Sequence, residues 1–329
     1  MKAMRNVASA LLALAILSTS GCARHSSSEV YYMVVTHATL PYWQTAADGF
    51  DQAAAEYKVK AKVVGPETYD PQAELQALHQ AIAAKPAGIM ISVSDVSLLQ
   101  AEIDAAINAG IPVITFDSDA VGSRRLFFIG TNNLESGRLG GRRVIEKLGG
   151  RGNVVFFTIP GQTNVEERLK GFKEVFATRP DIHIVNVVDM KGDARYAFDW
   201  AQESLALTAD KKIDAYVCLD SSSGKAVADA LKRSGATDRL LVVWDADPAT
   251  LDGIKGGTID STITQKPYTM GYLGLKALDE IYHDPPKQLN KDYSASSFAP
   301  YPAFVDTGTS LVDKTNVDLY IRSAAETSK

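Results

Sequence analysis

The chain of 329 residues is 46% hydrophobic and 22% charged, which is the composition of a soluble globular protein. Its formal net charge of -5 argues against a nucleic-acid partner, because a phosphate backbone requires a basic face. The chain is also too long for one small hydrophobic core, so two domains are expected.

Residues 1–22 have the pattern of a secretory signal: a basic start, an apolar run over residues 7–17, and small residues before Cys22. The apolar run is too short to span a bilayer, which needs roughly twenty residues. A cysteine directly after Ser-Gly resembles a bacterial lipobox, although Thr19 stands where leucine is usual. We therefore expect export to the periplasm or cell envelope, a lipid anchor on Cys22, and a tether over residues 23–29.

Cys218 is the second of two cysteines and lies in the apolar run AYVCL. With Cys22 assigned to the lipid, no disulfide partner is left for it. We expect a buried free thiol and not a catalytic one.

Residues 30–43, VYYMVVTHATLPYW, predict a strand, a short polar loop and the start of a helix. Strands and helices then alternate. The pattern predicts a helix over 45–57, a strand over 59–64, a helix to Lys85 capped by Asp70, a strand over 88–92, a helix over 98–109 and a strand over 111–116. Such alternation indicates parallel pairing with right-handed crossovers, and therefore a doubly wound sheet.

The same rhythm starts again near Asn132, which predicts a second lobe of the same architecture. Its expected strands cover 153–158, 183–189, 215–219, 240–244 and 261–265, with helices between them. A long helix follows over 267–282. The tail, residues 302–320, is expected to form a short strand and a helix.

The strand ends carry the candidate site, because ligands of open α/β sheets bind beyond the carboxyl ends of the strands. Tyr42 and Trp43 stand just past the first strand. These two rings have an alternative structural role, as a hydrophobic staple that covers the start of the helix.

Seven segments in order resemble the type I periplasmic binding proteins, nearest the ribose-binding-like sugar receptors of ABC importers; they are VVTHATLPYW, IPVITFDSD, FIGTNNLESG, VEERLKGF, VVWDADP, STITQKP and VDTGTSLVDKTNVD. The resemblance implies an α/β fold of two Rossmann-like lobes joined by a three-strand hinge, which traps a ligand by closure. It places residues 30–131 and 266–292 in the N-terminal lobe, and residues 132–265 and 298–322 in the C-terminal lobe.

The resemblance also implies site residues, position by position: Thr36, Tyr42, Trp43 and Asp117 in the first lobe, and Asp220, Asp245 and Gln265 in the second. Aromatic rings pack on the C–H face of a sugar and leave its hydroxyls to polar partners. Asp117 matches a carboxylate that accepts from two hydroxyls, although capping the next turn is its alternative. Trp244 is either a wall of the site or core.

Four positions depart from the ribose-binding pattern. Ser118 and Glu166 stand where ribose receptors have arginines, and Leu40 and Asp220 stand where they have asparagines. Ribose is therefore doubtful as the ligand, because a site stripped of charged donors leaves hydroxyls unpaired.

Replacement donors come from elsewhere in the second lobe. Asn164 is one candidate and Arg195 another. Arg168 matches a different arginine of the family, which we take as structural.

An enzyme is the first alternative function, because Asp117 and Asp119 form an Asp-x-Asp at a strand end. No phosphate loop, nucleophile elbow or HExxH spacing accompanies them.

Three further alternatives share the fold. A LacI-type regulator needs a DNA-binding helix pair at the position that the signal segment occupies. A sensory receptor subunit has the same ligand-binding fold, so the sequence does not distinguish it from a transport protein. The acidic residues also leave open a cationic ligand held by Tyr42 and Trp43. The expected function is capture of a monosaccharide or polyol for an ABC transporter permease by a monomeric binding protein, with no cofactor, no metal and no catalysis.

Overall fold

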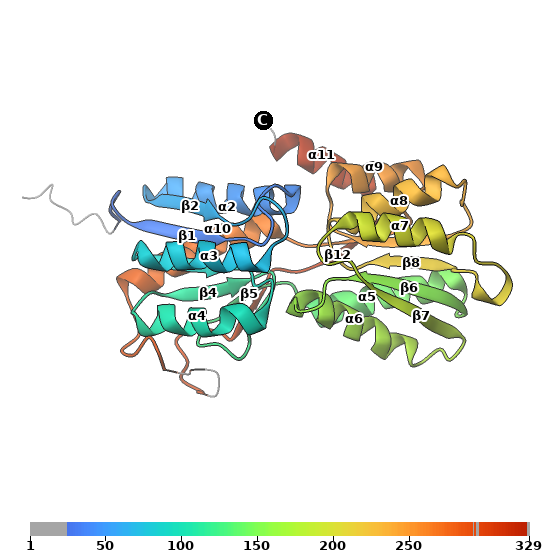
Figure 1. Ribbon diagram of the computed structural model, residues 1–329. Helices are drawn as coiled ribbons and strands as arrows, with labels where there is room; N and C mark the ends of the chain where they lie inside the picture. Colours follow the sequence, from blue (N-terminus) through green and yellow to red (C-terminus); the bar gives the residue numbers. More distant parts are fainter. Residues whose placement is uncertain (1–24, 292, 294–295, 328–329) are drawn as a thin grey trace, which may run out of the picture.

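Two six-stranded sheets form the centres of two lobes that lie side by side (Figure 1). The computed structural model describes residues 25–291, 293 and 296–327. The expected signal and Cys22 lie outside these described residues. Within them, no helix combines the length and the apolar character that crossing a membrane requires.

The first sheet has the order β11-β5-β4-β3-β1-β2, and all its strands are parallel. Its strands are β1 (Val30–Val34), β2 (Lys60–Val64), β3 (Gly88–Ile91), β4 (Val113–Phe116), β5 (Phe128–Gly130) and β11 (Phe304–Asp306). Helices α2 (Pro41–Tyr57) and α10 (Pro267–His283) pack together, as do α3 (Pro71–Ala83) and α4 (Val96–Asn108). The α2–α10 crossing needs glycine, because a Cβ on Gly49 would lie 2.0 Å from the Tyr268 carbonyl oxygen.

The second sheet has the order β12-β10-β9-β8-β6-β7, with only β12 antiparallel to its neighbour. Its strands are β6 (Gly152–Thr158), β7 (Ile182–Asp189), β8 (Ala215–Cys218), β9 (Leu240–Trp244), β10 (Ser261–Thr264) and β12 (Ser310–Asp313). The surrounding helices are α5 (Asn133–Leu148), α6 (Thr163–Phe176), α7 (Ala194–Ser204), α8 (Ser223–Arg233), α9 (Pro248–Gly256) and α11 (Val317–Thr327), with a 3-10 turn at Ala209–Lys211.

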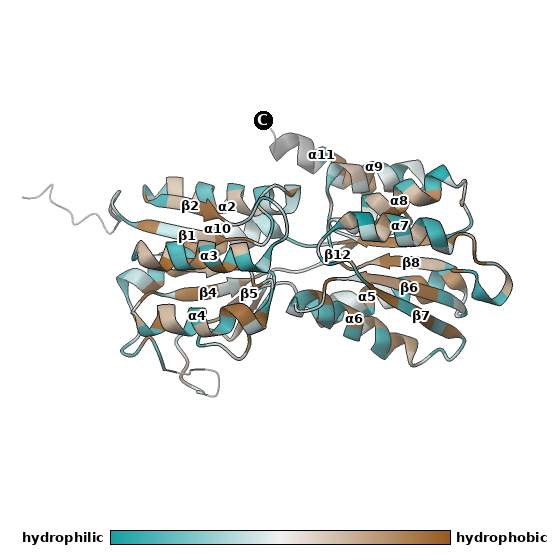
Figure 2. Ribbon diagram, viewed as in Figure 1, coloured by the Kyte–Doolittle hydropathy of each residue, from teal (hydrophilic) through white to brown (hydrophobic). Residues whose placement is uncertain are grey.

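Hydrophobic residues concentrate on the strands of both sheets, whereas the helices are mixed (Figure 2). This is the pattern of parallel sheets covered on both faces. Strand β8 is buried throughout, and Cys218 at its end is a free, buried thiol, as predicted. Asp70 caps α3 by accepting from the backbone N–H groups of Gln72 and Ala73, also as predicted.

The tail differs from the expected division into lobes. Residues 298–322 were assigned to the second lobe, but β11 pairs in parallel with β5 of the first sheet. Phe304 stacks on Phe128 across this pair, with ring centroids 5.3 Å apart, and so covers an otherwise open sheet edge. Only from β12 onward does the tail join the second sheet. The chain therefore passes between the sheets three times, after β5, β10 and β11.

Candidate ligand-binding site

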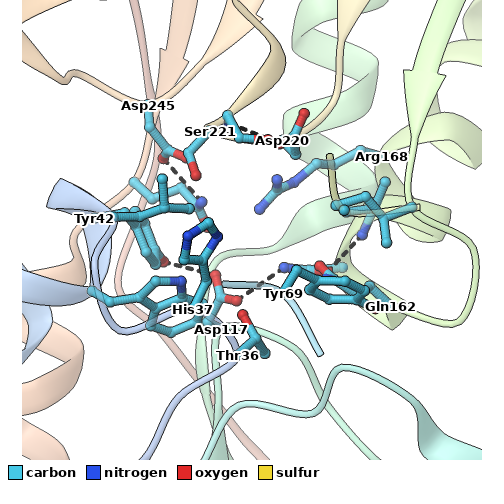
Figure 3. Close-up of a pocket in the computed structure, with 18 residues that line it drawn as sticks. Thr36, His37, Tyr42, Tyr69, Asp117, Gln162, Arg168, Asp220, Ser221 and Asp245 are labelled. Atoms are coloured by element: carbon cyan, nitrogen blue, oxygen red, sulfur yellow. Dashed lines mark hydrogen bonds between the residues drawn. The ribbon is translucent and has the colours of Figure 1, made fainter. Parts of the chain in front are cut away.

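A cavity lies between the two lobes, where the carboxyl ends of both sheets meet (Figure 3). Residues from both lobes line it, and most of the lining side chains are polar or aromatic. Eight of the residues singled out from the sequence line it: Thr36, Tyr42, Trp43, Asp117, Asn164, Asp220, Asp245 and Gln265.

Asp117 is the centre of the first lobe's polar contacts. It follows β4 with a left-handed backbone, φ 57°, which directs its side chain away from the strand. Its Oδ1 accepts from the Tyr42 hydroxyl at 2.7 Å, and its Oδ2 accepts from Ser92 Oγ and Asn164 Nδ2, both at 3.1 Å. Burial raises the pKa of Asp117, and the nearby Arg168 charge opposes that rise.

Tyr42 and Trp43 form an aromatic wall on the first turn of α2. Pro41 starts this helix and fixes the position of both rings. Their rings meet edge to face with centroids 5.0 Å apart, and Trp43 also meets Phe116 edge to face. Both side chains are buried among protein atoms and line the cavity, so they serve the core and the site together.

Asp245 and Gln265 form the facing wall in the second lobe. Asp245 follows β9 with φ 67°, and its Oδ1 accepts from Gln265 Nε2 at 3.0 Å. The Gln265 Oε1 atom is buried and has no partner among the described residues, so it is an available acceptor. Burial raises the pKa of Asp245 to about 7 from its ordinary 3.8, despite the opposing charge of Arg168.

Arg168 is the main functional candidate that the sequence analysis assigned to structure alone. Its Nε donates to Asn133 Oδ1 at 2.9 Å and its Nη1 to the Leu219 carbonyl at 2.7 Å, which holds the guanidinium rigidly. The remaining Nη2 is buried without a partner among the described residues, and Arg168 lines the cavity. A buried donor left unpaired is costly, so Nη2 is suited to an acceptor atom of a ligand.

Asp220 lines the cavity but is largely engaged by its own lobe. Its carboxylate accepts from the backbone N–H of Ser222 at 2.7 Å and from the hydroxyls of Ser222 and Ser223. It therefore holds the loop that leads into α8, whose N-cap residue is Ser222.

Two residues assigned to the site, Ser118 and Glu166, are absent from the cavity lining. Ser118 is fully buried beside the tip of β4. Glu166 lies on α6, and its carboxylate turns back to accept from the Gly161 backbone N–H at 3.0 Å. Both assignments came from the resemblance to ribose receptors, which have arginines at these two positions.

Other residues weighed from the sequence are also outside the cavity. Asp119 forms a two-bond ion pair with Arg125, so the Asp-x-Asp carboxylates do not act together. Trp244 packs on Phe172 in the core. Arg195 is exposed and pairs with Asp193 in its own loop.

Ten cavity residues were not assigned to the site by the sequence analysis, and six of these have polar side chains: His37, Tyr69, Gln162, Arg168, Ser221 and Ser222. Most of them lie in loops that follow strands, directly beside residues that were assigned. Burial lowers the pKa of His37, which favours a neutral imidazole at this position. The sequence places these residues in loops beyond strand ends, where a ligand is expected. It does not indicate which side chain of each loop faces the cavity.

The site thus presents acceptors, one rigid cationic donor and an aromatic wall, drawn from both lobes. Such a set matches a small neutral molecule that carries many hydroxyls, because each hydroxyl both donates and accepts. Two lobes that meet at a polar cavity, joined by three crossings, define a ligand-trapping binding protein.

Comparison with known proteins agrees with that class. Residues 31–283 match the family model of the periplasmic binding protein domain. The chain belongs to this family, whose members are non-catalytic solute-binding proteins of the type I fold.

Three relatives illustrate the similarity. AraP, an arabinose-binding protein from Geobacillus stearothermophilus, is 34% identical, with 89% of this chain and 99% of AraP covered and a TM-score of 0.73. A carbohydrate transporter solute-binding protein from Agrobacterium radiobacter, solved in complex with D-arabinose, is 27% identical, with 90% and 98% covered and a TM-score of 0.80. The xylose/arabinose-binding protein XylF from Sulfolobus acidocaldarius is 24% identical over 305 residues, 87% of this chain and 72% of XylF.

Proposed function

We propose that the protein captures a monosaccharide between its lobes and delivers it unchanged to an ABC importer. The observation that carries this proposal is the cavity itself, in which Asp117, Asp245 and the unpaired Nη2 of Arg168 converge beside Trp43. The carboxylates accept from sugar hydroxyls, Nη2 donates to a ring or hydroxyl oxygen, and the indole covers the C–H face.

The ligand class we propose is an aldopentose, with arabinose and xylose as the leading members. Relatives named for arabinose or xylose occur among both the sequences and the structures that resemble this chain. Ribose is tested beside these two pentoses, because Ser118 and Glu166, the positions that argued against it, do not line the cavity, whereas Arg168 supplies a charged donor there.

A cationic ligand is less well supported than a neutral sugar. The surplus of acidic residues that motivated this alternative is largely neutralised or engaged elsewhere: Asp119 pairs with Arg125, Glu166 accepts from Gly161, and Asp220 accepts from Ser222. The two carboxylates that remain, Asp117 and Asp245, share the charge of Arg168. Because the Arg168 guanidinium already interacts with both carboxylates, they attract a cationic ligand less strongly.

Hinge closure is the proposed mechanism of capture. Contacts between the lobes already exist at the bottom of the cleft, where Asn164 donates to Asp117 and Thr163 Oγ1 donates to the Asp119 carbonyl at 2.8 Å. A sugar that contacts both walls binds the closed form more tightly than the open form. Binding therefore shifts the equilibrium between the two forms toward the closed one. The importer then receives the closed form.

Export, lipidation at Cys22 and a monomeric state remain proposals, supported by the signal pattern of residues 1–22 and by the periplasmic family. The lobe division at residues 131/132 and 265/266 is proposed likewise, with the second lobe's tail beginning at β12.

A thermal-shift screen tests the ligand class. Arabinose, xylose, ribose, galactose, glucosamine and a polyol are each added to the purified chain, and hits are titrated by calorimetry. A pentose is expected to raise the melting temperature most, because a ligand that binds only the native state stabilises it. A response to glucosamine alone would favour the cationic alternative, and no response to any sugar would contradict the proposal.

A further inference from the structure

A second cluster of polar side chains lies at the opposite end of the first lobe from the cavity. His25 and Glu29 precede β1, and Asp279 and His283 lie on the last turns of α10. Figure 1 shows the amino-terminal end of β1 pointing away from the second lobe. One nitrogen or oxygen atom from each of the four residues lies within 4.8 Å of the other three.

Three of the six distances between these atoms are close to those in a metal coordination shell, and two of the three are also hydrogen bonds. His25 Nδ1 lies 3.2 Å from Asp279 Oδ1, His283 Nε2 lies 3.2 Å from Glu29 Oε2, and His283 Nε2 lies 3.6 Å from Asp279 Oδ1. Zinc bonds to histidine nitrogen and carboxylate oxygen are about 2.0–2.2 Å long, so tetrahedral ligands are about 3.3–3.6 Å apart.

The charge of the cluster also calls for a cation. The Asp279 side chain is 2% exposed and that of Glu29 is 9% exposed, so two carboxylates are largely withdrawn from water. Among the described residues, their ion-pair partners are His25 and His283, with no lysine or arginine. A divalent ion bound by two carboxylates and two neutral imidazoles gives a neutral site, which offsets the cost of burying the two charges.

The surrounding groups hold three of the four side chains in place. The Tyr31 hydroxyl donates to Asp279 Oδ1 at 3.1 Å, and the Ser26 backbone N–H donates to Glu29 Oε1 at 3.0 Å, which leaves Oε2 toward His283. The His25 ring stacks on Tyr57 with centroids 4.4 Å apart. Such outer contacts orient metal ligands in known sites.

We propose that His25, Glu29, Asp279 and His283 form a divalent metal site, and that its ion is Zn²⁺. Two imidazoles with two carboxylates suit zinc better than calcium or magnesium, which prefer all-oxygen shells of higher coordination number. The ion joins the segment before β1 to the end of α10, and thereby fixes the entry of the chain to the first lobe. The site is independent of the sugar cavity and of the function proposed for it.

Zinc titration of the full chain, without an affinity tag and in a Cys22→Ser background, tests this site. Calorimetry is expected to give one Zn²⁺ per chain, and zinc is expected to raise the melting temperature. Substitution by Co²⁺ is expected to give the visible absorption of a tetrahedral complex. The His25→Ala/His283→Ala double variant is expected to bind zinc more than about 100-fold more weakly, beyond the 10–100-fold typical of losing an outer partner.

The matched control is His79→Ala, because His79 forms an exposed pair with Glu102 at 3.0 Å without further ligands. It is expected to leave zinc affinity unchanged, and the double variant is expected to keep its sugar affinity. Absence of zinc binding by the folded parent chain, or equal binding by the double variant, would overturn the proposal. If the double variant fails to fold, the single variant His25→Ala, in the segment before β1, supplies the same comparison.

Discussion

Asp117 and Asp245 follow equivalent strands of the two sheets and share a left-handed backbone, with φ of 57° and 67°. β4 is the fourth strand counted from β2, and β9 is the fourth counted from β7. Aspartate tolerates this conformation better than most residues, and outliers of this kind concentrate at functional sites. The repeated architecture thus places one carboxylate on each wall of the cavity.

The pH dependence of stability is predicted to reveal Asp245. Its pKa of about 7 in the folded chain exceeds the ordinary 3.8 of the unfolded chain. The folded state therefore binds the proton more tightly, so the contribution of Asp245 to the free energy of unfolding is greatest below about pH 4 and is lost as the pH rises through 7. Asp245→Asn removes this dependence without losing tolerance of the left-handed backbone. Urea denaturation of ligand-free protein should be measured at pH 5 and pH 8. The free energy of unfolding of the variant, relative to that of the parent, should be higher at pH 8 than at pH 5. Equal changes in both proteins would contradict the prediction.

Asn164 is predicted to contribute to ligand affinity through its bond to Asp117. Asn164→Ala removes the donor and should weaken sugar binding by about tenfold, as expected for one hydrogen bond to a charged group. Asn164→Asp keeps the acceptor for the Val165 N–H but places a second carboxylate against Asp117. Calorimetry should rank affinity as parent, then alanine, then aspartate. An aspartate variant that binds like the parent would show that the two side chains do not meet in solution.

Trp43 is predicted to report ligand binding by its fluorescence. The chain has three tryptophans, and Trp43 alone lines the cavity. Trp43→Phe keeps an aromatic packing partner for Phe116 and should abolish the emission change on adding sugar while weakening affinity several-fold. The control is Trp200→Phe, since Trp200 packs on Phe157 in the second lobe. If the emission change persists in Trp43→Phe and disappears in Trp200→Phe, the fluorescence response comes from Trp200, and the prediction is wrong.

Cys22 is predicted to hold the protein at the membrane. Cys22→Ser should move the chain from the detergent-soluble membrane fraction to the aqueous one, with the thermal transition unchanged. Cys218 is not expected to carry lipid, because it is buried in β8 and burial raises the pKa of its thiol. Continued membrane attachment of Cys22→Ser would exclude the proposed anchor.

The sequence predicted where the site lies better than which side chains form it. Alternating strands and helices imply parallel sheets, whose carboxyl ends meet at one edge, and Asp117, Asp245 and Gln265 follow from that rule. The direction of a side chain beyond a strand end depends on local backbone angles and neighbours. Ser118 and Glu166 were expected at the site, and neither is among the residues that line the cavity.

Arg168 and β11 show two further limits of sequence reasoning. A buried arginine has several donors, and only the structure shows that two are engaged while Nη2 faces the cavity. β11 is three residues long, and its pairing with β5 joins segments far apart in the chain. Such a contact leaves no periodic signal in the sequence.

Calorimetric titration of the best aldopentose into the parent, Asp117→Asn and Asp245→Asn tests the central claim most directly, because these two residues stand on opposite walls. Each substitution alone is predicted to weaken binding by roughly 10- to 150-fold, the equivalent of about 1.5–3 kcal/mol for a hydrogen bond to a charged group. Parent-like affinity in either variant would contradict capture of the sugar between the two lobes.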